Sequence, residues 1–346
     1  MKKLLISTAL VSSVLTGVAF SQTTITGEMR IGYKTHYDAV DPKDNARGNG
    51  FGTEQQINIQ NKGKTNFGWD YASGFSIEVD ANSAASSFDE NVFIDFINPS
   101  SGTTLSISRD HIQRSDSARN ASVAFGYDAP DVMDGATTST EASSLLIQAS
   151  PGTNAGQSFG FAIIQDVAKL GKVSYSYIPN TVEAGTSEGM GVSSASAYEV
   201  GFTGGLGVAG LNTYAFKGAK DAAGVAGKKP SQTNFGVSYN TGPITAGVEY
   251  TKHIGRNTTL GTADNDEIKE KGYGLAYAVN KDLSLQIHHT TASKDDRPED
   301  AKVTSIQAGY NLGPVALIVG AGKYEGITGA ANEDGRTIFT RLLTAF

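Results

Sequence analysis

Most of the chain consists of short runs in which apolar and polar residues alternate. The first run has one apolar face (Ile25, Met29, Ile31, Tyr33) and one polar face (Glu28, Arg30, Lys34, His36). Alternation with a period of two predicts a β-strand that separates two different environments. Five such runs precede residue 110 and eleven follow residue 157. The pattern therefore predicts an all-β fold of sixteen strands.

The connections between these runs are of two kinds. Tight turns such as Asn98 to Gly102 and Asn240-Thr241-Gly242 have residues that favour turns, and the first tight turn is predicted at Ala72-Ser73-Gly74. Long polar loops are predicted at residues 38–52, 179–196, 254–269, 293–300 and 325–335. Short turns on one side and long loops on the other are typical of an antiparallel up-and-down barrel in an outer membrane. A soluble all-β protein is the other class that such a chain fits.

The longest break in the alternation is residues 110–157. Its first part is mainly basic (Arg109, His111, Arg114, Arg119) and its middle is acidic (Asp128, Asp131, Asp134). The sequence Thr138-Ser139-Thr140-Glu141 resembles a capping box, which predicts a helix over residues 142–148. Counting residues 143–149 as a strand would give a barrel of seventeen strands. An even number of strands, in contrast, keeps both termini of the chain on the same side of the membrane. We therefore predict an inward-folded third external loop that narrows the pore, with an ordinary surface loop as the alternative.

The first 21 residues have the pattern of a secretory signal peptide. Lys2-Lys3 precedes a mostly apolar stretch, and Ala19-Phe20-Ser21 fits a cleavage site. A mature chain of residues 22–346 retains 26 of the 28 basic residues and all 35 acidic ones, a balance of −9. That charge argues against nucleic acid as a partner. Because cysteine is absent, no disulfide can stabilise the fold.

A barrel of this size encloses water, and charges at its narrowest section then select solutes. Four cations, Arg30, Lys34, Lys62 and Lys64, are predicted to point inward from the first two strands, and Arg341 from the last. On the opposite side of the pore, the loop would present Asp128, Asp131 and Asp134. The cations and these acids together would produce an electric field across the pore. The alternative is that these are merely solvated residues of the lumen.

Nothing in the sequence indicates an enzyme. His288 and His289 would point to opposite faces of one strand and cannot share a metal, and no zinc or nucleotide-binding spacing occurs. We expect no catalytic residue, metal or cofactor. The acidic patches at residues 264–267 and 295–296 could hold divalent cations that bridge lipopolysaccharide in the surrounding lipid.

Both ends of the mature chain resemble the general porin family of Gram-negative bacteria. The start, Gln22-Thr23-Thr24-Ile25-Thr26-Gly27-Glu28, looks like that family's first strand, and the last strand ends on an aromatic residue, Phe346. The resemblance implies a water-filled outer-membrane channel for passive diffusion of small hydrophilic solutes and ions. It also implies a homotrimer latched by the loop at residues 81–90, with Phe346 read by the barrel-assembly machinery. A substrate-selective channel and a structural or adhesin-type barrel without an open pore remain alternatives.

Overall fold

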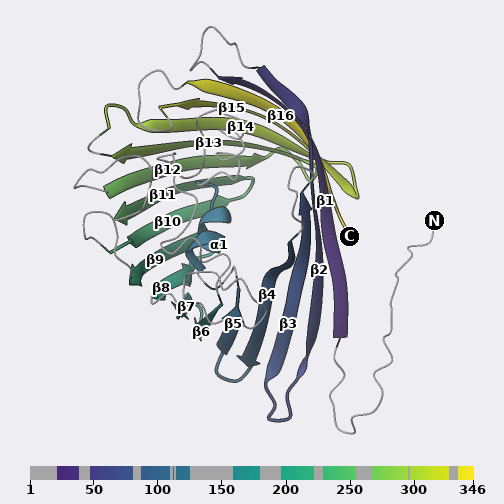
Figure 1. Cartoon of the computed structure of the whole chain (residues 1–346), viewed down its shortest axis with the longest axis vertical. Coiled ribbons are helices and arrows are strands. Elements are labelled where there is room, and N and C mark those ends of the chain that lie inside the picture. Colours follow the sequence, from purple (N-terminus) through teal and green to yellow (C-terminus); the bar gives the residue numbers. More distant parts are fainter. Residues whose placement is uncertain are drawn as a thin grey trace, which may run out of the picture.

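The structure is a computed structural model that describes residues 22–38, 47–80, 87–109, 112, 114–124, 159–179, 196–221, 229–254, 267–294, 297–326 and 334–346. Sixteen strands in these ranges form a closed antiparallel barrel, in which sequence neighbours pair and β1 pairs with β16 (Figure 1). Five strands precede residues 110–157 and eleven follow, so the predicted strand number and order are confirmed. No helix in the described ranges is long and apolar enough to cross a membrane.

The elements have the following bounds: β1 Gln22–Asp38, β2 Arg47–Lys64, β3 Asp70–Asp80, β4 Ser87–Asn98, β5 Thr103–Ser108, α1 Arg114–Asn120, β6 Gly160–Val167, β7 Gly171–Ile178, β8 Ser196–Gly204, β9 Leu211–Asp221, β10 Ser231–Thr241, β11 Ile244–Ile254, β12 Glu267–Ala278, β13 Leu283–Lys294, β14 Ala301–Asn311, β15 Val315–Glu325 and β16 Gly335–Ala345.

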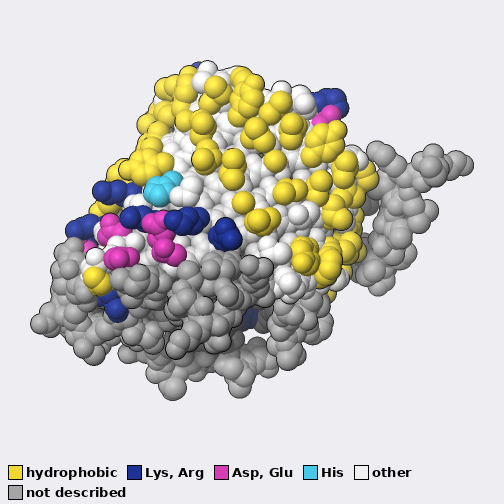
Figure 2. Space-filling model, turned by 90° about the horizontal axis from the view of Figure 1, so that it is seen from above, with side chains coloured by type: hydrophobic (Ala, Val, Ile, Leu, Met, Phe, Trp, Pro, Cys, Tyr) yellow, Lys and Arg dark blue, Asp and Glu magenta, His cyan; other side chains and the backbone are white. Residues whose placement is uncertain are grey.

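The two faces of the barrel wall differ as the alternation predicts. Outward positions carry large apolar side chains such as Ile25, Ile306 and Ile338, each more than half exposed, and together they form an apolar band (Figure 2). Many inward positions of the wall are polar or small, for example Ser106 of β5, Gln232 of β10 and Thr290 of β13, which are buried. An apolar outer band and a polar interior are the pattern of a barrel that faces lipid outside and water inside.

The barrel closes between the two ends of the chain. Met29 of β1 lies opposite Thr344 of β16, and the backbone N–H groups of Gly27 and Phe346 each donate to the other residue's carbonyl oxygen at 2.9 Å. Because β1 also pairs with β2 from Gln22 to Tyr37, the described strands form a closed ring. A closed ring is required in lipid, where an unpaired backbone group costs several kcal/mol.

One predicted turn is wrong. The chain turns at residues 65–69, where the backbone N–H of Thr65 donates to the carbonyl oxygen of Trp69 at 2.7 Å and Gly68 adopts a φ of +87°. Ala72, Ser73 and Gly74 lie within β3 and pair with β2. The prediction failed because Phe67, Trp69 and Tyr71 continue the alternation through the turn. Several strands also extend into the predicted loops, as β2 does by starting at Arg47.

Candidate functional site

Helix α1 lies inside the barrel, against the inner wall (Figure 1). Side chains of the helix bond to inward residues of β8, β11 and β12. Just before the helix, Ile112 is fully buried in a cluster with Ala162 of β6, Ile178 of β7 and Ala197 of β8. Over residues 112 and 114–124, the chain between β5 and β6 is therefore attached to the inside of the wall.

The first turn of α1 is capped by a residue of the wall. Glu199 of β8 accepts hydrogen bonds from the backbone N–H groups of Arg114 at 2.7 Å and Ser115 at 3.1 Å, and from the Ser115 hydroxyl group. The first N–H groups of a helix have no partner within the helix, and a negative charge is favourable at that end. Glu199 meets both needs at a buried position, so it fixes where the helix begins.

The last turn of α1 is held by a buried ion triad. The Arg119 guanidinium donates to Glu249 of β11 at 3.2 Å and to Glu270 of β12 at 3.1 Å, and all three side chains are 1% exposed. The hydroxyl group of Tyr214 on β9 donates to the second oxygen of Glu249 at 2.6 Å. Buried charges are tolerated only when they are paired. The triad therefore favours one position of the helix.

Glycines on β11 and β12 make room for the chain that follows α1. A Cβ atom at Gly274 would lie 1.7 Å from the backbone oxygen of Val123, and one at Gly272 would lie 2.5 Å from that of Ala124. A Cβ atom at Gly247 would lie 2.7 Å from a methyl group of Val123. Glycine in a strand interior often marks such a close backbone approach. These three positions form a track that only glycine permits.

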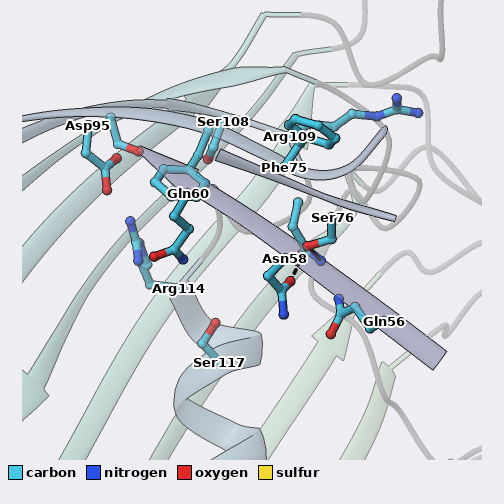
Figure 3. Close-up of a pocket in the computed structure, with 13 residues that line it drawn as sticks. Gln56, Asn58, Gln60, Phe75, Ser76, Asp95, Ser108, Arg109, Arg114 and Ser117 are labelled. Atoms are coloured by element: carbon cyan, nitrogen blue, oxygen red, sulfur yellow. Dashed lines mark hydrogen bonds between the residues drawn. The ribbon is translucent and has the colours of Figure 1, made fainter. Parts of the chain in front are cut away.

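On the opposite side of α1, a cavity of about 500 Å³ separates the helix from strands β2 to β5 (Figure 3). Its lining is mostly polar: Gln56, Asn58 and Gln60 of β2, Ser76 of β3, Asp95 of β4, Ser106 and Ser108 of β5, and Arg114 and Ser117 of α1. Ser76 donates to Asn58 at 2.5 Å and accepts from Asn91 at 3.2 Å. A polar cavity along the wall is suited to water and hydrophilic solutes.

A second cavity, of about 450 Å³, continues from the first toward the short turns. It is lined by Thr104, Ile164, Lys172 and Thr203, which lie near the turn ends of their strands. Ser106 and Ser108, further along β5, line the first cavity instead. The two cavities share Asp95, Arg114 and Ser117, and Figure 3 shows Arg114 extending from the start of α1 on the same side as Asp95. They are thus arranged in series, and these three residues lie where they meet.

The family model for Gram-negative porins matches residues 7–328 of the chain. The chain belongs to the Gram-negative porin family. A search of curated proteins by sequence found no match. The family and the closed barrel together establish an outer-membrane channel for passive diffusion.

Solved structures share the fold of this porin at low sequence identity. An anion-selective porin from Comamonas acidovorans matches with a TM-score of 0.66 at 14% identity, over 94% of this chain and 100% of the other. A loop-deletion mutant of OmpT, an outer membrane protein of Vibrio cholerae, matches with a TM-score of 0.63 at 12% identity, over 94% and 99%. A multiple mutant of the Rh. blastica porin matches with a TM-score of 0.59 at 15% identity, over 94% and 100%.

Three of the predicted pore cations lie together at the seam of the porin barrel. Arg341 of β16 is opposite Gly32 of β1, between the inward positions of Arg30 and Lys34. The seam is not purely basic, because Arg30 forms ion pairs with Glu28 at 2.6 Å and Glu54 at 2.9 Å. Sequence alternation placed these cations on one face but gave no register, so it could not show that an acid of β2 lies opposite Arg30.

Lys62 and Lys64 do not join this group. Arg30 lies opposite Glu54, and Lys62 is eight residues further along β2, opposite Gln22. At roughly 3.3 Å per residue, this separates the two levels by about 26 Å. Lys64 is exposed and pairs with Asp70 at 3.1 Å, on the other side of the turn. The predicted grouping of four cations is therefore not found: Lys62 and Lys64 lie at the turn end because the turn is at residues 65–69.

The three predicted loop acids, Asp128, Asp131 and Asp134, lie outside the described residues, as do residues 138–149 with the predicted helix. The helix that the structure does describe, α1, was not predicted. Its sequence, Arg-Ser-Asp-Ser-Ala-Arg-Asn, has no apolar face, and its position depends on Glu199, Glu249 and Glu270 from distant strands. Within this stretch itself, the signal in the sequence was its basic character, and Arg114 and Arg119 are among the residues that carry it.

Proposed function

We propose that ions and small hydrophilic solutes cross this porin along the two cavities between α1 and the wall of β2 to β8. The observation that supports this route is that the cavities adjoin at Asp95, Arg114 and Ser117, while the opposite side of α1 is packed against the barrel. At the junction, Arg114 and Asp95 are the charged groups that a passing ion meets. They therefore set the ion preference of the channel.

The described lining of the route is more basic than acidic. Arg109, Arg114 and Lys172 carry positive charge, and Asp95 carries negative charge. Lys172 pairs with Asp166 at 3.4 Å, but both side chains are at least half exposed, so this pair is weak. A modest preference for anions follows. Arg30, Lys34 and Arg341 at the seam, and Asp128, Asp131 and Asp134 in the loop, would adjust this preference further.

Replacing Arg114 by glutamine should shift the reversal potential in a salt gradient toward cations, and Asp95→Asn should shift it toward anions. A fixed charge a few ångström from an ion in a narrow lumen contributes about 1 kcal/mol or more, which is a severalfold change in permeability ratio. The shifts should fade near 1 M salt, where the Debye length is about 3 Å. Lys281→Gln, in an exposed turn, is the matched control. Equal reversal potentials in all three variants would rule out the route.

Export and assembly complete the proposal. Residues 1–21 direct secretion and are removed, and three copies associate with the loop at residues 81–90 as a latch. The last residue, Phe346, is read by the barrel-assembly machinery, and the barrel contacts outer-membrane lipid and lipopolysaccharide. The apolar outer band, the ends of the chain and the family membership support these steps. N-terminal sequencing of the mature protein should find Gln22, and a different first residue would contradict the cleavage site.

A further inference from the structure

Asp95 and Arg114 carry opposite charges and line both cavities, yet neither side chain forms an ion pair with any described residue. Asp95 belongs to β4 in the barrel wall, and Arg114 belongs to the first turn of α1. Figure 3 shows the two side chains bordering the same space, one from the wall and one from the helix. We call these two residues the junction pair.

The wall around Asp95 supplies no counter-charge. Across the sheet, Asp95 lies opposite Ala72 of β3 and Ser106 of β5. Its neighbours on the same face of β4, Phe93 and Ile97, are apolar. Asp95 is half-buried, and its Oδ1 atom is buried without a hydrogen-bond partner. An ionised carboxylate in such surroundings is costly unless a cation or a set of donors reaches it.

The side chain of Arg114 is likewise unpaired, although an acid lies close to its backbone. Glu199 accepts a hydrogen bond from the backbone N–H of Arg114 at 2.7 Å, and both of its carboxylate oxygens are used by the start of α1. The Nε atom of Arg114 is buried and has no hydrogen-bond partner. By contrast, the guanidinium of Arg119 on the same helix is held by two buried acids. Arg114 therefore keeps its side chain available for a ligand.

Two serine hydroxyl groups beside the junction pair also lack partners. Ser106 and Ser108 of β5 are each 3% exposed and line the larger cavity, and their Oγ atoms have no hydrogen-bond partner. Buried polar atoms in folded proteins are normally hydrogen-bonded to protein, water or a ligand. Four unsatisfied atoms thus border this cavity, from Asp95, Ser106, Ser108 and Arg114. Together they are a set of donors and acceptors that a bound molecule can satisfy.

The two charges of the junction pair define the class of molecule that fits. A cation is attracted by Asp95 and repelled by Arg114, and an anion meets the reverse. A neutral polyol leaves both charges without a counter-charge. A zwitterion between the two side chains satisfies both, because its carboxylate can accept two parallel hydrogen bonds from the guanidinium and its ammonium group can donate to the carboxylate. Such charge-assisted hydrogen bonds are roughly twice as strong as neutral ones.

We propose that the junction of the two cavities is a binding site for α-amino acids. Arg114 binds the α-carboxylate and Asp95 binds the α-ammonium group. The side chain of the amino acid lies in the larger cavity, among the amide groups of Asn58 and Gln60 and the hydroxyl group of Ser108. The cavities, of about 500 Å³ and about 450 Å³, have the size of small-molecule sites. This inference rests on the proposed function and names a substrate class for it, because the junction must lie on the route through the barrel.

The test uses the refolded full-length protein in planar bilayers, with L-glutamine as the probe. L-Glutamine has no net charge near neutral pH and carries no current, so a bound molecule is seen as an interruption of the ion current. The frequency of interruptions should rise with the concentration of L-glutamine. L-Glutaminamide keeps only the ammonium group, and N-acetyl-L-glutamine keeps only the carboxylate. Each should bind at least about tenfold more weakly, since each loses one of the two hydrogen-bonded charge contacts.

Two double variants test whether the junction pair forms the site. Asp95→Asn with Arg114→Gln removes one charge of each sign, so it should abolish the interruptions by L-glutamine while the net charge of the route stays the same. Lys281→Gln with Asp282→Asn removes an ion pair of 2.7 Å in an exposed turn and is the matched control, in which the interruptions should persist. The comparison of the three ligands needs only the parent protein, so it decides the question even if a variant does not fold.

Three results would overturn the amino-acid site: no interruption of the parent by L-glutamine, equal affinity for L-glutamine and both analogues, or equal affinity in the parent and the junction double variant. The route itself is tested by the reversal potentials of the single variants Asp95→Asn and Arg114→Gln. If these potentials shift while the double variant still binds L-glutamine like the parent, the route stands and the amino-acid site is wrong. If neither potential shifts, the proposed route is wrong.

Discussion

Replacing Arg119 by methionine should release α1 from the barrel wall. The substitution keeps much of the side-chain volume but leaves Glu249 and Glu270 buried without their shared cation. Breaking a buried ion pair by removing one partner costs about 3 to 5 kcal/mol. We expect a large rise in open-channel current noise in single-channel recordings, because the helix forms one side of the proposed route.

A compensated variant shows whether the effect comes from the unpaired acids. Adding Glu249→Gln and Glu270→Gln to Arg119→Met removes both negative charges. The open-channel current noise of this triple variant should fall most of the way back to that of the parent. Arg114→Met is the matched control, since Arg114 lies on the same helix and lines the cavities without joining the triad. A quiet channel in Arg119→Met alone would mean that the triad does not hold the helix in place.

The architecture of the barrel was readable from the sequence because lipid and water face opposite sides of every strand. Outward-facing positions therefore recur every two residues along a strand. The number and order of the strands then follow from counting the alternating runs. The last strand is an example: Ile338 and Leu342 are exposed outward and Thr337 is buried inward, as the alternation predicts. Errors arose where an aromatic run continued across a turn, as at Phe67 and Trp69.

The site was less accessible to sequence reasoning because it depends on register and on contacts between distant residues. Arg119 lies 130 residues from Glu249 and 151 from Glu270. One local signal exists: Glu249 and Glu270 stand at inward positions next to glycines, Gly247 and Gly272. Acidic residues among inward-facing glycines indicate a part of the barrel wall that another segment of the chain approaches closely. Most strand aromatics do face outward, but Tyr214 and Phe339 are buried inside, a difference that hydropathy alone does not reveal.

Deleting Phe346 should abolish assembly of the barrel in the cell while secretion continues. Phe346 makes the final backbone pair of the β1 and β16 seam with Gly27, and its ring lies over that glycine, where a Cβ atom would be 2.5 Å from the ring. Phe346 as a residue is 67% exposed, so another protein can contact it. Folded barrel in the outer membrane should fall to a small fraction of the parent, with mature chain still present in the periplasm.

The decrease in the stability of the barrel that the deletion causes is too small to explain such a loss of folded barrel in the outer membrane. The experiment therefore separates an assembly signal from a structural role. The deletion removes two backbone hydrogen bonds, worth about 1 to 3 kcal/mol together, from a barrel with sixteen paired strands. The deleted chain should therefore still refold in detergent, while Phe346→Ala, which keeps the backbone pair, should fail in the cell like the deletion. Phe346→Tyr keeps an aromatic ring and should assemble. Normal yield of the deletion variant in cells would show that the last residue is not an assembly signal, and failure to refold in detergent would show that its role is structural.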